Sequence, residues 1–529
     1  MSETIEHQVQ PDALKKDRSR NILLNTLTSY ADDIVDAITM LILIPFLIKT
    51  LGKDSFGLWS LIWAFVSLFE LADLGFAASI VKYVADAKGR GDSERLKKIV
   101  GTMFWVYAGI GALLLSGVLL SLLFFNRLFD IPDAYSGAAK FVLIVLGARS
   151  AMLMPLGMFR GVIAGYQKAS VANVYKTIAA ILYFIASLIV LSILPDIKAF
   201  AVVNLVLGVL PMIVIGIHVK KTIPDIQLSP KIFDRKIIKE IGSFSIYFTI
   251  IQVSRFIYTR VDSIIIKAFL PLEMVAVYAI SMRLSEKSSQ FCFQLIKNLS
   301  PVVAELHAAG EVANIRAVWE RGTKLAVAFA TPLLLGLAVL SEPLIRVWTG
   351  PGFELAVPAC QWLIAANFLG VIHGNTNNIL SMVGQQKFIA MATLASQILN
   401  IIFSILLIKP FGIVGVSIAT FAVTLPLQIG VIQVKAGKLY HLSLWRFYSR
   451  TVLPSIPPAI LLVGFLYVFQ RFYPLKNLLE VAVLEAIGVT LFFSTFWFIG
   501  FEKKERDYFK EKVLKRLMNR PAKQVVLKS

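Results

Sequence analysis

Blocks of about 20 apolar residues recur along the whole chain, and they constrain its fold more than any motif does. Of 529 residues, 57% are hydrophobic and only 16% are charged. A block of about 20 apolar residues crosses a hydrocarbon core of roughly 30 Å as one α-helix. Runs such as GALLLSGVLLSLLFF are apolar on every side, which favours helices over the alternating strands of a barrel. We therefore predict an all-α integral membrane protein with about 14 transmembrane helices.

The formal net charge of +20 raises the question of nucleic-acid binding. About 37 of the 53 Lys and Arg residues fall in connections on one side of the predicted membrane, about 10 on the other side and about 6 within spans. This asymmetry is the positive-inside pattern, so the basic balance indicates topology and not a nucleic-acid partner. It predicts that both termini are cytoplasmic. Since the first 20 residues hold no short apolar core before a cleavage site, no removable signal peptide is expected.

The sequence lacks the features expected of a metal site, an ATP-binding site or an enzyme. Cys292 and Cys360 form no CxxC pair, and the five histidines are not at metal-ligand spacing, so we expect no metal or other cofactor. The chain has no GxxxxGK[ST] motif, so ATP is not expected as a direct energy source. Connections on the predicted outer side are about a dozen residues or fewer, too short for a folded domain. A membrane glycosyltransferase or polymerase is therefore only a remote alternative, and we expect no enzymatic activity.

An internal repeat predicts the organisation of the chain. GYQKAS at 165–170 recurs as GQQKFI at 384–389, and Ala85 matches Ala304 in the same register. A spacing of about 219 residues holds six helices, so two lobes of equal orientation are expected, related by an axis along the membrane normal. The predicted parts are a cytoplasmic tail (1–20), an N-lobe of helices 1 to 6 (21–219), a cytoplasmic linker (220–239), a C-lobe of helices 7 to 12 (240–436), helices 13 and 14 (437–500) and a basic cytoplasmic tail (501–529).

One block of the first half carries a family resemblance. IPFLIKTLGKDSFGLWSLIWAFVSLFELADLGFAASIVKYVADAKGRGDSERL is similar to the N-terminal signature of bacterial polysaccharide flippases. These form the Wzx-type branch, for O-antigen and exopolysaccharide, of the multidrug/oligosaccharidyl-lipid/polysaccharide exporter superfamily. RVDSIIIKAFLPLEMVAVYAISMRL in the second half carries the matching pattern, although Pro271 and Val277 stand where glycine is usual.

The resemblance implies a multidrug-extruder-like fold and a defined task. That task is to move an undecaprenyl-pyrophosphate-linked oligosaccharide from the cytoplasmic to the outer leaflet of the bacterial cytoplasmic membrane, by alternating access. The implied partners are this lipid-linked oligosaccharide, membrane lipids and the polysaccharide polymerase machinery. A lipid II-type flippase and a cation-coupled multidrug extruder of the same fold are the alternatives, and mid-membrane arginines weigh against the extruder.

Cations within spans are candidates for the pyrophosphate, because arginine binds phosphate with a planar and permanently charged fork. Five such side chains are Arg149, Arg255, Arg283, Arg260 and Lys287. The first three fall at similar depth near mid-membrane and would form an anion site. The alternatives are an ion pair with Asp262 for Arg260, snorkelling to the cytoplasmic side for Lys287 and a packing role for Arg283.

Acidic residues near the start of the chain are candidates for coupling to a proton or sodium gradient. Asp32 and Asp36 share one face of the first helix, and Glu70 lies in the second span. A carboxylate in a partly buried site suits proton exchange. The alternative is that the helix 1 aspartates only line a wet cytoplasmic vestibule.

A polar cluster interrupts the tenth predicted span. Its members are His373, Asn375, Asn377 and Asn378, in the stretch VIHGNTNNIL. Amide and imidazole groups at mid-span are suited to contact sugar hydroxyls. An internal hydrogen-bond network between helices explains the cluster equally well.

Overall fold

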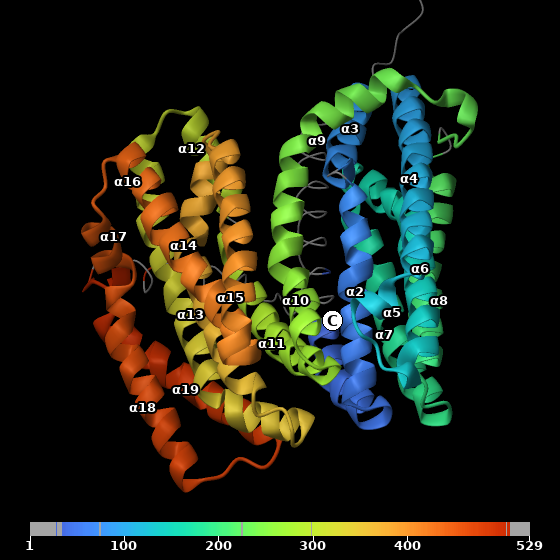
Figure 1. Cartoon of the computed structure of the whole chain (residues 1–529). Coiled ribbons are helices and arrows are strands. Elements are labelled where there is room, and N and C mark those ends of the chain that lie inside the picture. Colours follow the sequence, from blue (N-terminus) through green and yellow to red (C-terminus); the bar gives the residue numbers. More distant parts are fainter. Residues whose placement is uncertain are drawn as a thin grey trace, which may run out of the picture. The chain divides into compact units, whose positions relative to one another are not determined.

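The computed structural model describes residues 28, 34–73, 76–223, 226–297, 299–503, 505–507 and 511. Every regular element within these ranges is a helix, which confirms the predicted class (Figure 1). Eleven helices among the described residues are long and apolar enough to cross a membrane. One of them, Gln386–Tyr440, has 55 residues and contains a non-helical break at Gly412. Because one crossing needs roughly 20 residues, this stretch is long enough for two. The total of about 14 helices remains a prediction.

The described chain divides into two compact units. Unit 1 comprises residues 1–283, 348–359 and 386–423, and unit 2 comprises residues 284–347, 360–385 and 424–529. The boundaries fall inside α11, α13, α14 and α15, so these four long helices contribute residues to both units. The predicted two-lobe division and the internal repeat remain predictions.

Unit 1 holds most of the first half of the chain. It begins with a helix at Ile34–Leu51. The elements that follow are α2 (Lys53–Glu70), η1 (Leu71–Asp73), α3 (Phe76–Gly89), α4 (Ser93–Ser121), α5 (Phe125–Leu128), α6 (Asp133–Gly165), α7 (Ala169–Ile193), α8 (Ile197–Thr222), η2 (Pro230–Ile232), α9 (Arg235–Phe256), the π-helical η3 (Ile257–Val261), α10 (Asp262–Phe269) and the first half of α11 (Leu272–Lys297).

Unit 2 takes most of its residues from the second half of the chain, although most of α15 (residues 386–423) belongs to unit 1. The elements after α11 are α12 (Ser300–Ala308), α13 (Val312–Thr349), α14 (Ala356–Met382), α15 (Gln386–Pro426), the π-helical η4 (Leu427–Gln433), α16 (Val434–Tyr440), α17 (Leu444–Thr451), η5 (Leu453–Ser455), α18 (Ile456–Phe472) and α19 (Leu478–Ile499).

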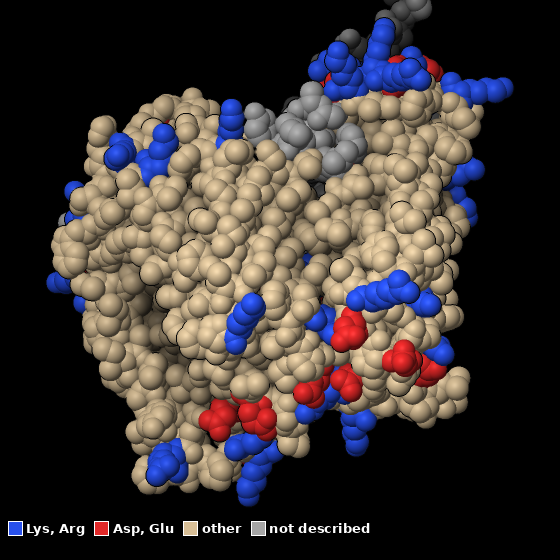
Figure 2. All heavy atoms as spheres, viewed as in Figure 1, with Lys and Arg blue, Asp and Glu red and all other residues tan. Residues whose placement is uncertain are grey.

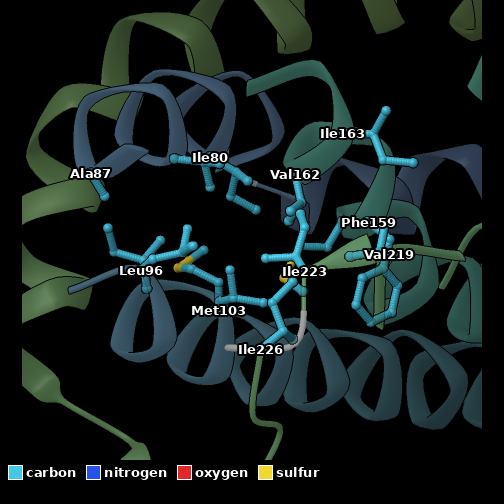
Figure 3. Packing of buried hydrophobic residues seen from close by; sticks show 14 of the residues in the cluster. Ile80, Ala87, Leu96, Met103, Phe159, Val162, Ile163, Val219, Ile223 and Ile226 are labelled. Atoms are coloured by element: carbon cyan, nitrogen blue, oxygen red, sulfur yellow. The ribbon is translucent and has the colours of Figure 1, made fainter. Parts of the chain in front are cut away.

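Unit 1 packs around an apolar core near the connection between α3 and α4. Figure 3 shows Ile80 and Ala87 of α3 facing Leu96 and Met103 of α4, with α6 contributing Phe159. All five side chains are 5% exposed or less. Burial of large apolar side chains stabilises such a core by about 1.5–3 kcal/mol each relative to exposure in water. This core holds the ends of α3, α4 and α6 together, and α6 forms one wall of the candidate site.

Charged side chains of unit 1 gather near helix ends. Figure 2 shows a dense group of Lys and Arg where α3 meets α4, and mostly uncharged atoms along the sides of the helices. Three ion pairs lie at this end: Arg90 with Asp86, Lys97 with Glu94, and Arg95 with Glu240. An uncharged flank between charged ends is the surface that a hydrocarbon layer requires.

The motif Phe56-Gly57-Leu58-Trp59 lets α2 approach α11 closely. A Cβ atom at Gly57 would lie 2.4 Å from the carbonyl oxygen of Leu272. Gly57→Ala must therefore separate the two backbones, and we expect it to destabilise the protein by about 1–3 kcal/mol, the usual cost of overpacking. Thermal unfolding in detergent measures this. Gly109→Ala is the matched control, because a Cβ there meets nothing within 4 Å. Equal midpoints for the two variants would show that the contact is unimportant.

Candidate anion-binding cavity

A cavity of about 690 Å³ opens within unit 1 between α6, α7 and α8. Small residues create the space, because glycine and alanine leave room that longer side chains would fill. The small residues on its wall are Gly157, Gly161, Ala164, Ala169, Ala172, Ala179, Ala180 and Gly208. We call this space the α6–α8 cavity.

Three cations line the α6–α8 cavity at different depths. Arg149 and Arg160 lie on α6, and Lys176 lies on α7. Arg149 is at the midpoint of α6, about 24 Å from either end, whereas Arg160 is about 8 Å from the end that leads into α7. Residues 149 and 160 are three turns apart on one helix face. The cavity therefore presents positive charge from near one end of α6 to its middle.

Arg149 is held by packing, and its guanidinium keeps a donor that no described residue satisfies. Its Cζ lies 5.0 Å from the centroid of the Trp63 ring, a cation–π contact. A Cβ at Gly208 would lie 2.5 Å from Arg149 Nε, so only glycine lets the guanidinium rest against α8. Arg149 Nε is buried and has no hydrogen-bond partner among the described residues. Buried donors are normally satisfied, so this one marks a place for an acceptor that no described residue supplies.

Polar groups complete the surroundings of Arg149. Ser150 Oγ donates to Glu70 Oε1 at 2.6 Å, and the Glu70 carboxylate acts electrostatically on Arg149. On the opposite wall, Asn204 Nδ2 donates to the Tyr183 hydroxyl at 3.4 Å. These hydroxyl and amide groups can hydrogen-bond a polar ligand that Arg149 holds by charge.

Arg283 joins this arrangement from α11. Its Cζ lies 5.9 Å from the Phe56 ring centroid, and Phe56 and Trp63 are two turns apart on one face of α2. The two arginines thus contact one aromatic stripe of α2, whose two residues are about 10 Å apart along the helix axis. Both also act electrostatically on the Tyr183 hydroxyl. The structure therefore brings together two of the three arginines predicted for an anion site.

The other predicted cations lie elsewhere. Arg255 is exposed on α9, and its side chain makes no interaction with another described residue, so its place in a three-arginine site remains a prediction. Arg260 is half-buried in the π-helical η3. The neighbouring Asp262 accepts a hydrogen bond from the Tyr278 hydroxyl. Lys287 is half-buried in unit 2.

The predicted acidic residues differ in their surroundings. Asp32 lies outside the described residues, and Asp36 is exposed on the first helix. Glu70 is half-buried and bonded to Ser150. The nearby Asp73 ends the 3-10 turn η1 and accepts from the Tyr107 hydroxyl at 2.6 Å. Ion coupling by any of these carboxylates remains a prediction.

The polar cluster of α14 forms hydrogen bonds within unit 2. His373 is fully buried, and its Nε2 lies 2.7 Å from the Tyr448 hydroxyl. Asn375 Nδ2 donates to the Trp319 carbonyl, and Asn377 Nδ2 to Gln428 Oε1. Asn378 Oδ1 accepts from Ser300. This is the interhelical network that the sequence left as an alternative, and contact of these residues with sugar remains a prediction.

Sequence reasoning overlooked Lys176, Tyr183 and Asn204. Lys176 and Tyr183 lie in the apolar span of α7 and Asn204 in that of α8, and a polar residue within an apolar span is the signal that did draw attention to Arg149. Glu485 was overlooked for the same reason, as the one charged residue between Val481 and Ile499 in the last span.

The chain matches a family of known membrane proteins. The model of the family described as "Polysaccharide biosynthesis protein" matches residues 19–307, which is 289 of 529 residues, and a MatE model matches residues 248–406. The first match spans more than half of the chain. The protein therefore belongs to the polysaccharide biosynthesis protein family, and the predicted resemblance to polysaccharide flippases is confirmed.

Two curated relatives are similar over long stretches. "Uncharacterized membrane protein MJ1068" of Methanocaldococcus jannaschii is 27% identical over 281 residues, covering 50% of this chain and 53% of the relative. "Probable flippase AglR" of Haloferax volcanii is 22% identical over 384 residues, covering 71% of this chain and 75% of the relative. The alignment thus spans about half of the first relative and three quarters of the second.

Solved structures show the same fold. "Lipid II flippase MurJ, inward closed conformation" has a TM-score of 0.65 at 16% identity and covers 93% of this chain and 100% of that one. An inward-facing multidrug resistance MATE family transporter of the MOP superfamily also has a TM-score of 0.65 at 16% identity, covering 79% of this chain and 96% of that one. The protein is a multi-pass helical membrane protein with the fold of these transporters.

Proposed function

We propose that the protein flips an undecaprenyl-pyrophosphate-linked oligosaccharide from the cytoplasmic to the outer leaflet of the bacterial cytoplasmic membrane. Its product would feed the synthesis of a surface polysaccharide, such as O-antigen, capsule or exopolysaccharide. The observation that carries this proposal is Arg149, which lines a cavity at the middle of a membrane-spanning helix with a buried donor that has no acceptor among the described residues.

The cations of the α6–α8 cavity suit a pyrophosphate. A multiply charged anion and several hydroxyl groups cannot enter hydrocarbon unaided, because one unpaired hydroxyl costs roughly 2–7 kcal/mol and an ion far more. Arg160 and Lys176 near one end of α6 and α7 would attract the pyrophosphate, and Arg149 would hold it deeper. A cavity of about 690 Å³ is in the range of sites for small organic ligands, enough for the pyrophosphate and the first sugars.

The proposed transport cycle forms and breaks no covalent bond. Glu70 would balance the charge of Arg149 when the cavity is empty, and the arriving pyrophosphate would replace it as the partner. Arg283 would act on the same anion from α11. Alternating access would then release the substrate outward, with entry of a proton or sodium ion as the energy source. One elementary charge gains about 2.3 kcal/mol per 100 mV.

A lipid II-type flippase is the second candidate. The solved flippase of lipid II is similar over 93% of this chain, more than the 79% covered by the multidrug transporter. Both lipid-linked candidates present a pyrophosphate to the cavity, so the same cations would serve either substrate. The two candidate substrates differ in the glycan that the pyrophosphate carries.

Location and partners follow from the proposed substrate. Undecaprenyl-linked sugars are made at the cytoplasmic face of bacterial membranes, where we place both termini. The product would pass to polysaccharide polymerase machinery on the outer side.

The test is a flipping assay in sealed proteoliposomes. Wild-type protein is supplied with an undecaprenyl-pyrophosphate oligosaccharide, with lipid II or with a cationic drug. The proposal expects the oligosaccharide lipid to cross fastest. Faster crossing of lipid II would favour the second candidate, and transport of the drug alone would refute both.

A further inference from the structure

Unit 2 contains a carboxylate that has no counterion and no hydrogen bond among the described residues. Glu485 is on α19, about 10 Å from the start of this apolar helix. Its Oε2 atom is buried and has no hydrogen-bond partner among the described residues. The proposed anion site in unit 1 makes no use of this residue.

The Glu485 carboxyl fits against one glycine of α13. A Cβ atom at Gly336 would lie 2.2 Å and 2.3 Å from the two Glu485 carboxyl oxygens. The carboxyl group therefore occupies the space that any other residue at position 336 would fill. Val481 and Leu484, within about one turn of Glu485 on α19, and Leu340, about one turn from Gly336 on α13, belong to a buried apolar core that also holds Leu462 and Leu466 of α18.

The charged residues of the neighbouring helices are distant or already paired. On α19, Glu480 is bonded to Asn477. On α13, Lys324 Nζ pairs with Glu505 at 2.6 Å, and Glu342 and Arg346 are about 9 Å and 15 Å along the axis from Gly336.

The other helices add no counterion. Arg471 is exposed in the last turn of α18, at the end that leads into α19, and η5 has no charged residue. No charged group among the described residues acts electrostatically on Glu485.

Burial of an ionised carboxylate without a counterion costs far more free energy than burial of a neutral carboxyl group. Transfer of an unpaired ion into an apolar medium is so unfavourable that the group takes up a proton instead. The neutral carboxyl then needs one acceptor for its O–H. The carbonyl of Val339, one turn from Gly336, has no helical amide donor, because residue 343 is proline. Sodium would require several oxygen ligands, which this apolar setting does not offer.

We infer that Glu485 is a proton-binding site, in which the carboxyl takes up a proton when it packs against Gly336 and releases it when α13 and α19 separate. Proton binding itself does not depend on the identity of the substrate. Its use to drive transport rests on the proposed flippase function. The site would place proton coupling in unit 2, apart from the helix 1 aspartates.

Infrared difference spectroscopy of the purified full chain, titrated over a range of pH, tests the proton site. Wild type should show a protonated-carboxyl band at neutral pH that Glu485→Gln lacks. Glu480→Gln, on the same helix but at a carboxylate that Asn477 already hydrogen-bonds, should keep the band. A band that persists unchanged in Glu485→Gln would overturn the inference. If that variant fails to fold, Gly336→Ala serves instead, because it displaces the carboxyl and should release the proton at lower pH.

Coupling is measured separately, in the flipping assay with and without an imposed proton gradient. Glu485→Gln should lose the acceleration by the gradient while it keeps the rate measured without one. An undiminished gradient response in this variant would contradict the coupling role. Absence of flipping by wild type would contradict the proposed function and the coupling role, and the infrared titration would still decide whether Glu485 binds a proton.

Discussion

Replacement of Arg149 by alanine should reduce flipping of a pyrophosphate-linked oligosaccharide roughly 10- to 100-fold. Hydrogen bonds to charged groups contribute about 1.5–3 kcal/mol, and each 1.4 kcal/mol changes an equilibrium about tenfold. The guanidinium lies at the middle of α6 with a buried Nε that no described residue accepts from, so its loss removes the deepest anion contact in the cavity. Initial rates in proteoliposomes, at several substrate concentrations, measure the effect.

The Arg149→Lys variant tests whether the positive charge alone or the shape of the guanidinium is needed. Lysine keeps the positive charge but loses the planar fork and the stacking on Trp63, so an intermediate rate is expected. Thermal unfolding of both variants in detergent shows whether the fold is retained. A rate for Arg149→Ala equal to wild type, in a folded protein, would remove Arg149 from the site.

Trp319→Ala should cause the largest loss of stability, about 3–5 kcal/mol, because it empties a closely packed centre of unit 2. Trp319 is 1% exposed, and its ring centroid lies 5.1 Å from Phe447 and 5.8 Å from Tyr440. Its indole N–H donates to Thr376 Oγ1 at 2.8 Å, so truncation also leaves this hydroxyl without its donor. Chemical unfolding in detergent micelles measures the loss.

Trp445→Ala is the control for this prediction. The Trp445 side chain is 75% exposed on α17, so its removal should change the free energy of unfolding by less than about 0.5 kcal/mol. Similar losses in both variants would mean that burial does not set the stability of unit 2.

The sequence was sufficient for the fold class because membrane helices follow from length and hydropathy. Each block had to satisfy its own backbone hydrogen bonds in hydrocarbon, and a helix of about 20 residues does so alone. The break at Gly412 within Gln386–Tyr440 depends on local backbone geometry, which hydropathy does not report.

The site was harder to predict, because the position of a residue along a helix does not tell which neighbouring helix its side chain faces. Arg149, Arg255 and Arg283 were grouped by depth alone. Arg149 and Arg283 do lie against the same face of α2, in contact with Trp63 and Phe56 respectively. Arg255 is exposed on α9. Which side of a helix faces a neighbour depends on tertiary packing, as the contact between Gly208 and Arg149 illustrates.

The same limit applies to the polar cluster of α14. Its composition suits both sugar binding and internal hydrogen bonding, and only the positions of Tyr448 and Trp319 show which partners are in reach. Those partners come from α17 and α13, far away in the sequence.

The central claim is that unit 1 recognises the pyrophosphate of a lipid-linked sugar through Arg149. The most direct measurement compares binding of two lipids to the full chain in nanodiscs. Both carry the same glycan on undecaprenol, one through a pyrophosphate and one through a neutral linkage. We predict tighter binding of the pyrophosphate lipid by wild type, and loss of this preference in Arg149→Ala. Equal binding of both lipids by wild type would contradict the account.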